Sequence, residues 1–252
     1  MKRVFILDKS DNRIERLGSL MQMRGHKVLN ADALISEDEK AIYIFAPNYL
    51  LKSQKLSSIP NNSIIYCGRS DFDYTLEISS RNIDVFEYSK DEEFSIKNAD
   101  YTAEATLFLM LGLMDYQLVD AKVLIIGFGR CGRAMCKYLY NLRANLTIMT
   151  DKPYEAMLFG ATTSYENENF GKYDVIINTA PRNVISDLQL EKLKKGVIVI
   201  DLASSPYGLN HIKARELGIN SDIYPALPAR FRVESATRAI FDFISKTQGE
   251  KL

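Results

Sequence analysis

A glycine-rich turn between a strand-like and a helix-like segment is the feature that most constrains how this chain can fold. Residues 122–135 read KVLIIGFGRCGRAM, which spaces Gly127, Gly129 and Gly132 as G-x-G-x-x-G directly after an apolar run. In this context the first glycine permits a tight turn, the second lets a ligand approach the backbone, and the third lets the helix pack on the strand. The free N–H groups at the start of the helix attract an anion. The sequence therefore predicts a Rossmann-type domain that holds a dinucleotide pyrophosphate, with Arg130 and Cys131 in the same loop.

An acidic residue stands where the next strand is expected to end. Asp151 follows Gly127 at close to the spacing of about 20 residues at which a carboxylate meets the adenosine ribose hydroxyls, which favours NAD. The neighbouring Lys152 could instead reach a 2′-phosphate, and aspartates after strands also begin ordinary turns. NAD and NADP therefore both stay open as the cofactor, with NAD preferred.

Short apolar, β-rich runs alternate with helix-period segments along the whole chain, which is typical of parallel sheets covered by helices. The predicted class is α/β, with two doubly wound parallel-sheet domains: a flavodoxin-like domain at 1–100 and a Rossmann domain at 101–252. In the first hundred residues we expect strands at 3–7, 27–29, 41–45, 63–66 and 84–87, and helices at 12–24 and 74–81.

The two predicted domains are joined by an apolar segment. Residues 91–100 are polar and interrupt the pattern, whereas 102–116 are so apolar that they predict a helix buried between layers. The second domain is expected to have strands at 123–126, 146–149, 175–178, 197–201 and 219–224, and helices at 133–142, 187–194 and 211–217. A closing amphipathic helix is expected at 233–245 and could pack back on the first domain.

Composition excludes several classes of function. Lys plus Arg and Asp plus Glu both number 32, so no net field draws the chain to nucleic acid or to an anionic membrane. No apolar run approaches the ~18 residues of a membrane span. The three cysteines form neither a metal-binding pattern nor a disulfide framework, which favours buried thiols in the reducing cytoplasm. We therefore expect a small-molecule ligand and no metal.

Three further loops follow strands of the expected Rossmann sheet. Ligands of such sheets lie at the carboxyl ends of the strands, so these loops are candidate cofactor contacts, although each one could also be an ordinary turn. Their candidate residues are Thr179, Pro181, Leu202, Ala203 and Pro228.

The succession GFGRCG, INTAP, IDLASSPYG and ALPA, preceded by KNADYTAE before the apolar helix, resembles the dipicolinate synthase A family over nearly the whole chain. The resemblance implies two α/β domains and a nicotinamide dinucleotide in the second. It also implies a partner, a flavoprotein-like B subunit, with which the family oxidises a dihydrodipicolinate-type precursor in sporulating bacteria. A small carboxylated substrate and a homo-oligomer such as a dimer are expected on the same basis.

The family element before the apolar helix matches at Asn98, Thr102 and Glu104, which with Ser204 are the candidate catalytic residues. Glu104 is the leading acid–base candidate, although a carboxylate near a helix start is commonly only a partner of the helix dipole. Of the two histidines, His26 precedes a strand and His211 begins a helix. Neither fits the histidine pattern of 2-hydroxyacid dehydrogenases.

The chain departs from the family at two basic positions. Ser205 replaces an arginine and Glu234 replaces a lysine, so two charges that could hold a substrate carboxylate are missing. Arg230 and Arg232 could supply them instead, or could simply be solvated on a loop. Two hypotheses follow: an NAD(P)-dependent oxidoreductase, or a non-catalytic nucleotide-binding or regulatory subunit that has kept the cofactor crevice.

Overall fold

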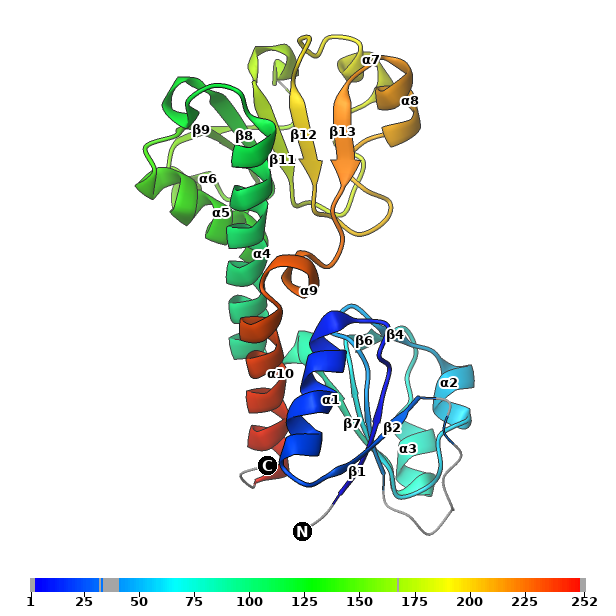
Figure 1. Cartoon of the computed structure of the whole chain (residues 1–252). Helices are drawn as coiled ribbons and strands as arrows, with labels where there is room; N and C mark the ends of the chain where they lie inside the picture. The colour runs from blue at the N-terminus through cyan, green and yellow to red at the C-terminus, as the bar shows by residue number, and fades with distance from the viewer. Residues whose placement is uncertain (1–2, 32, 34–40, 167, 250–252) are drawn as a thin grey trace. The chain divides into compact units, whose positions relative to one another are not determined.

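The computed structural model describes residues 3–31, 33, 41–166 and 168–249, whose course is drawn in Figure 1. The chain divides into two compact units. The first comprises Met1–Asn98 together with Pro228–Leu252, and the second comprises Ala99–Leu227. This division differs from 1–100 and 101–252 in that the last 25 or so residues belong to the first unit, because the closing helix packs there.

The first unit is built on a five-stranded parallel sheet with the order β2-β1-β3-β5-β7. This is the flavodoxin-like order, in which the chain reverses direction across the sheet beside its first strand. The strands are β1 (Val4–Leu7), β2 (Lys27–Asn30), β3 (Ala41–Ile44), β5 (Ile64–Cys67) and β7 (Asp84–Glu87), and β4 (Leu50–Leu51) pairs separately with β6 (Arg69–Ser70). The helices are α1 (Asn12–Met23), α2 (Ser53–Ser57) and α3 (Thr75–Arg81), with a 3-10 turn at Tyr88–Lys90.

The closing helix α10 (Val233–Gln248) packs against α1 within the first unit. The buried Thr237 hydroxyl donates to the carbonyl oxygen of Arg13 at 3.1 Å. Farther along α10, the Thr247 hydroxyl lies 2.6 Å from the hydroxyl of Tyr66 on β5. The first unit is thus completed by a segment that is distant from it in sequence.

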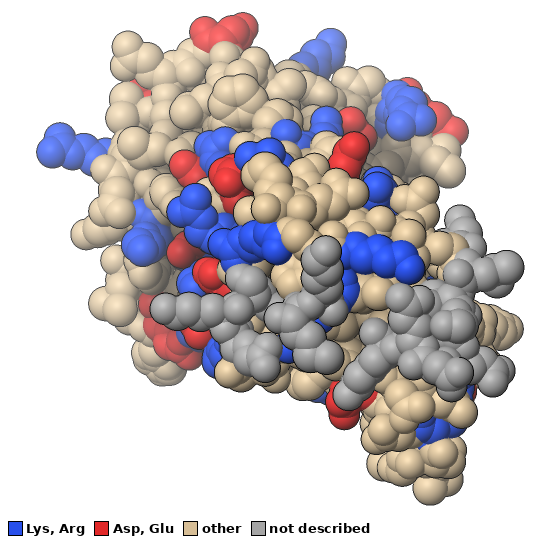
Figure 2. Space-filling model, turned by 60° about the horizontal axis from the view of Figure 1, so that its bottom comes forward, with Lys and Arg blue, Asp and Glu red and all other residues tan. Residues whose placement is uncertain are grey.

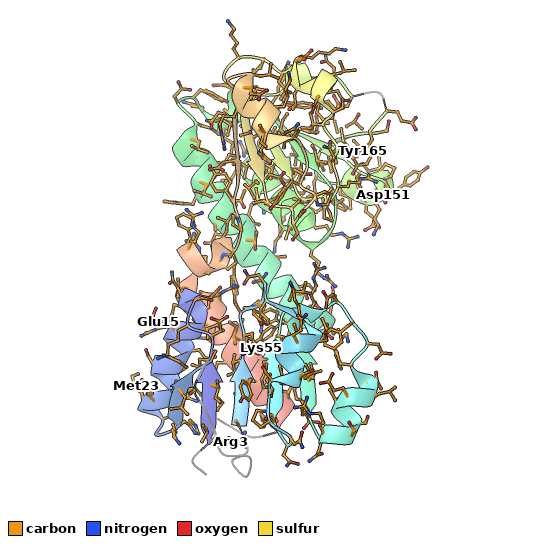
Figure 3. The ribbon with its side chains drawn as sticks, turned by 90° about the vertical axis from the view of Figure 1, so that its right-hand side faces the viewer. Arg3, Glu15, Met23, Lys55, Asp151 and Tyr165 are labelled. Carbon is orange, nitrogen blue, oxygen red and sulfur yellow. The ribbon has the colours of Figure 1, made fainter. Side chains whose placement is uncertain are left out.

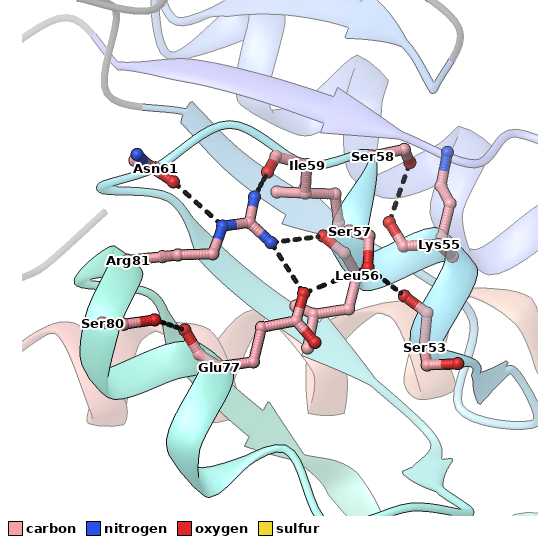
Figure 4. A network of polar contacts seen from close by, with 10 residues as sticks. All are labelled: Ser53, Lys55, Leu56, Ser57, Ser58, Ile59, Asn61, Glu77, Ser80 and Arg81. Atoms are coloured by element: carbon pink, nitrogen blue, oxygen red, sulfur yellow. Dashed lines mark hydrogen bonds and ion pairs between the residues drawn. The ribbon is translucent and has the colours of Figure 1, made fainter.

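One arginine ties α3 to the loop that follows α2 (Figure 4). Arg81 donates to the side chains of Asn61 and Glu77, both at 2.9 Å, and to the carbonyl oxygens of Leu56 and Ile59. These bonds join α3 to the C-terminal end of α2 and to the residues that follow it.

The second unit carries a six-stranded parallel sheet with the order β10-β9-β8-β11-β12-β13, the order of a Rossmann domain. Its strands are β8 (Lys122–Ile126), β9 (Asn145–Met149), β10 (Ala161–Thr163), β11 (Val175–Asn178), β12 (Ile198–Asp201) and β13 (Asn220–Ile223). Its helices are α5 (Arg130–Asn141), α6 (Pro153–Ala156), α7 (Asp187–Leu190) and α8 (His211–Glu216), with 3-10 turns at Leu118–Asp120 and Phe170–Lys172. The predicted fold class is confirmed for both sheets.

Helices cover both faces of this sheet, as the uninterrupted apolar strands require. On one face Met135 and Leu139 of α5 pack with Val123 and Ile148. On the other face Leu190 of α7 and Ala214 of α8 belong to a separate buried cluster. The strands of the core are therefore buried on both sides, and their carboxyl ends emerge into loops.

The linking helix differs from its prediction. The polar residues expected to break the pattern begin a single helix, α4 (Glu92–Leu113). The carboxylate of Asp91 accepts the backbone N–H of Phe94 at 2.7 Å, and Glu93 pairs with Lys97 one turn later. Polar residues in such capping and i, i+4 positions stabilise a helix. The expected burial all round is also wrong, because Leu111 is 47% exposed.

Several shorter elements were not predicted, because they are too short to show an apolar periodicity in the sequence. The strand β10 at the sheet edge and the helix α9 (Leu227–Phe231), which replaces an expected loop, are examples.

No described helix is long and apolar enough to cross a membrane. On the face in Figure 2, Lys and Arg side chains lie beside Asp and Glu side chains, in keeping with the balanced composition.

Candidate functional site

The carboxyl ends of all six strands in the second unit are aligned in one row. In register order the row consists of Thr163, Met149, Ile126, Asn178, Asp201 and Ile223. Residues that follow these strands bond back to a neighbouring strand; for example, Gly127 N donates to Met149 O, and Thr179 N donates to Ile126 O. Candidate residues that are distant in sequence are therefore brought to one edge of one sheet.

Two of the three motif glycines are required by packing. Gly127 has a φ of +95°, which favours glycine, and a Cβ there would lie 2.6 Å from the Thr179 hydroxyl oxygen. A Cβ on Gly132 would collide with the carbonyl oxygen of Gly127. The first turn of α5 is therefore pressed against the end of β8, as the motif predicts.

The middle glycine serves a different purpose. Among the described residues, no atom comes within 4 Å of a Cβ built on Gly129, so no packing requirement excludes a side chain there. Gly129 is the N-cap of α5 and has no side chain with which to cap that helix. An uncapped helix start with open space beside it can receive an anion on its N–H groups. These residues fit a pyrophosphate.

The loop after β11 is held by its own side chains. The Thr179 hydroxyl donates to the Ile126 carbonyl at 2.9 Å, which links β11 to the end of β8. The buried Asn178 amide donates to Ala180 O at 3.0 Å, and Ala180 N donates to Asn178 Oδ1 at 3.1 Å. These bonds fix the turn that leads to the exposed Pro181.

The fully buried carboxylate of Asp201 organises the loop after β12. Its Oδ1 accepts from Asn178 Nδ2 at 2.8 Å and from Ala203 N at 3.0 Å. Its Oδ2 accepts from Gly208 N at 2.7 Å and lies 3.0 Å from His211 Nε2. A buried carboxylate needs such donors, and here they close the loop that carries Leu202 and Ser204.

His211 begins α8, as the sequence predicts, but its partner is not predicted. Its Nε2 faces Asp201, and its Nδ1 lies 3.3 Å from the Ser221 hydroxyl. Both ring nitrogens are thus engaged within the second unit. No sequence spacing signals this contact, because β12 and α8 are brought together only by the fold.

The residues expected at the ribose lie on the same edge. Asp151 and Lys152 are exposed and follow the buried Thr150, whose hydroxyl accepts the backbone N–H of Lys152 at 2.9 Å. Both side chains therefore extend from a fixed turn at the end of β9. The structure thus brings Asp151 to the edge beside the glycine turn.

Cys131 lies in the first turn of α5. Burial raises the pKa of its thiol, although the nearby Arg130 charge opposes this shift. The other cysteines are buried free thiols, and burial raises the pKa of both Cys67 and Cys136 to about 12. None of the three is poised as a thiolate nucleophile.

The candidate catalytic residues come from α4 and from the loop after β12. Asn98 and Thr102 lie one turn apart on α4, whereas Glu104 is two residues beyond Thr102 and therefore about 200° around the helix. Ser204 is exposed in the loop after β12. Pro228 lies in α9 and belongs to the first unit. Among the described residues, no cluster of side chains could hold a metal ion.

Residues 95–207 match the family model of the D-isomer specific 2-hydroxyacid dehydrogenase, NAD binding domain. The A subunit of dipicolinate synthase from Bacillus subtilis (strain 168) is 24% identical over 210 residues, which cover 80% of this chain and 70% of that protein. The crystal structure of its counterpart from Bacillus halodurans superposes with a TM-score of 0.79 at 20% identity, covering 99% of this chain and 98% of that one. This chain is similar to the dipicolinate synthase A proteins.

A third relative matches only part of the chain. Shikimate dehydrogenase (NADP(+)) of Shouchella clausii (strain KSM-K16) is 32% identical over 108 residues, covering 37% of this chain and 39% of that protein. The family model confirms the predicted Rossmann-type NAD-binding domain, and the resemblance stated from the sequence motifs is confirmed as well.

Substitution of Gly132, which packing requires, should reduce stability more than substitution of Gly129, which faces open space. Gly132→Ala should lower the free energy of unfolding by about 1–3 kcal/mol, because its methyl group meets backbone rather than a mobile side chain. Gly129→Ala should cost less than about 1 kcal/mol, since only an N-cap is altered. Urea unfolding of both variants tests this. Equal losses for the two would contradict the assigned packing.

Proposed function

We propose that this protein is an NAD(P)-dependent oxidoreductase of the dipicolinate synthase A type that binds its cofactor at the carboxyl edge of the second unit. The observation that carries the proposal is the open, uncapped start of α5 at Gly129, framed by two glycines that packing requires. The match of residues 95–207 to an NAD-binding domain supports it.

The cofactor contacts follow from the aligned row of strand ends. The backbone of Gly127, Gly129 and Gly132, with that of Arg130 and Cys131, holds the pyrophosphate. The Asp151 carboxylate accepts hydrogen bonds from the ribose hydroxyls, which favours NAD. Lys152 could instead bind a 2′-phosphate, which would favour NADP. The loops after β11 and β12 extend the crevice with Thr179, Pro181, Leu202 and Ala203.

The reaction proposed is hydride transfer with a small carboxylated, dihydrodipicolinate-like substrate. The bound nicotinamide supplies the hydride-accepting carbon, while the protein positions the substrate and removes a proton. Glu104 is the proposed proton acceptor, and Ser204 is proposed to position the substrate. Asn98 and Thr102, which lie on a different face of α4 from Glu104, are the further proposed catalytic residues. The proposed assembly is a homo-oligomer that works with a flavoprotein-like B subunit.

A second candidate function is a nucleotide-binding or regulatory subunit without catalysis. Glu234, which replaces the family's lysine, is paired with Arg16 at 3.0 Å. Arg232 donates to the carbonyl oxygen of Phe231, and the Arg230 guanidinium lies 5.4 Å from the ring centroid of Phe231. These local contacts do not require a substrate carboxylate, so they favour a loss of that recognition.

Cofactor binding is tested with Gly129→Asp. Aspartate is a good N-cap and should leave the melting temperature unchanged or higher, but its carboxylate occupies the anion position and repels the pyrophosphate. We expect NADH fluorescence enhancement with the wild type and a Kd at least about 30-fold weaker for the variant. A wild type that binds neither NADH nor NADPH would refute both candidate functions.

Hydride transfer separates the two candidates. The wild type with a B subunit, NAD⁺ and a dihydrodipicolinate-type substrate should produce the absorbance of NADH, because oxidation of the ring sends a hydride to nicotinamide and a proton to a base. Glu104→Gln should reduce kcat at least about tenfold without weakening NADH binding. Cofactor binding without turnover would establish the regulatory role instead.

A further inference from the structure

An arginine and a tyrosine meet at the edge of the second unit outside the glycine turn. The guanidinium carbon of Arg182 lies 4.1 Å from the ring centroid of Tyr165. Tyr165 comes two residues after β10 and Arg182 four residues after β11, and the sheet places β9 and β8 between these strands. Three strand spacings amount to about 14 Å, so the two side chains reach toward each other across the ends of the intervening strands.

Both residues extend from supported positions. Tyr165 is half-buried against the cluster that contains Met149 and Ile126, on the face of the sheet opposite α5. Arg182 N donates to Ala180 O at 2.9 Å, in the turn that the Asn178 side chain fixes. Arg182 is exposed, and its guanidinium lies over the Tyr165 ring.

The pair lies beside the proposed ribose contact. Met149 and Thr163 are register partners, and Asp151 and Tyr165 each follow one of these partners by two residues. Both residues thus come two positions beyond the ends of neighbouring strands, and Figure 3 labels both on the same side of the unit. A nucleotide whose ribose meets Asp151 has its base at this end of the edge.

We propose that Arg182, stacked on Tyr165, is the platform on which the adenine ring of the cofactor lies. This rests on the proposed function. A guanidinium is planar, so it can stack on an aromatic ring with one face and receive a purine on the other. The ring of Tyr165 holds that plane in place, and no base-specific hydrogen bond is required. Arg182 thereby contributes affinity for the adenosine half of NAD and NADP alike.

The test measures NADH and NADPH binding by fluorescence, and ADP-ribose binding by calorimetry. Arg182→Ala should weaken all three by about tenfold, because all three carry adenine. Arg182→Lys should also weaken them severalfold, since it keeps the charge and loses the plane. The matched control Arg215→Ala, an exposed arginine on α8, should stay within about twofold of the wild type, as should Tyr165→Phe, which keeps the ring.

Other outcomes overturn the platform. The proposal is contradicted if Arg182→Ala binds all three compounds as the wild type does, or if Arg182→Lys does. It is also contradicted if only NADPH binding is weakened, because Arg182 would then bind the 2′-phosphate. A loss for NADH with none for ADP-ribose would also overturn it, because Arg182 would then act at the nicotinamide half. If the wild type binds none of the three compounds, the proposed function itself fails, which is a distinguishable result.

Discussion

The contact on which the second unit depends is the close approach of α5 to the end of β8. A Cβ on Gly132 would strike the carbonyl oxygen of Gly127, so the helix can take this position only because both residues are glycine. This close approach places the start of α5 at the carboxyl ends of the strands and leaves open space beside Gly129. The same contact that stabilises the domain thus leaves open the helix start at which we propose that the pyrophosphate binds.

The register of the six strands places further loops beside the start of α5. The last residues of six parallel strands form one row, so every loop that follows them begins at the same level. Asp201 then holds the loop after β12, and Asn178 holds the turn after β11, through buried hydrogen bonds. Buried polar groups of this kind fix loop geometry because an unpaired partner would be costly. The loops after β11 and β12 therefore have a fixed geometry at this edge.

Much of this could be predicted from the sequence, since apolar strands and glycine spacing are local signals. Val175–Asn178 and Asp84–Glu87 have the predicted bounds. The start of α4 could not be predicted in this way, because its stability comes from capping and ion pairs rather than from an apolar period. Nor could the contacts of Asp201 with His211 and of Tyr165 with Arg182, because each joins residues that only the sheet order brings together.

The central claim is that a dinucleotide pyrophosphate rests on the start of α5. The most direct measurement is a titration of ¹⁵N-labelled protein with NAD⁺, followed by the backbone amide resonances. The account predicts that the largest shifts fall on Gly129, Arg130 and Cys131, with smaller shifts at Thr179, while the amides of β5 in the first unit stay in place. Shifts that leave the glycine turn unchanged, or that are largest in the first unit, would contradict it.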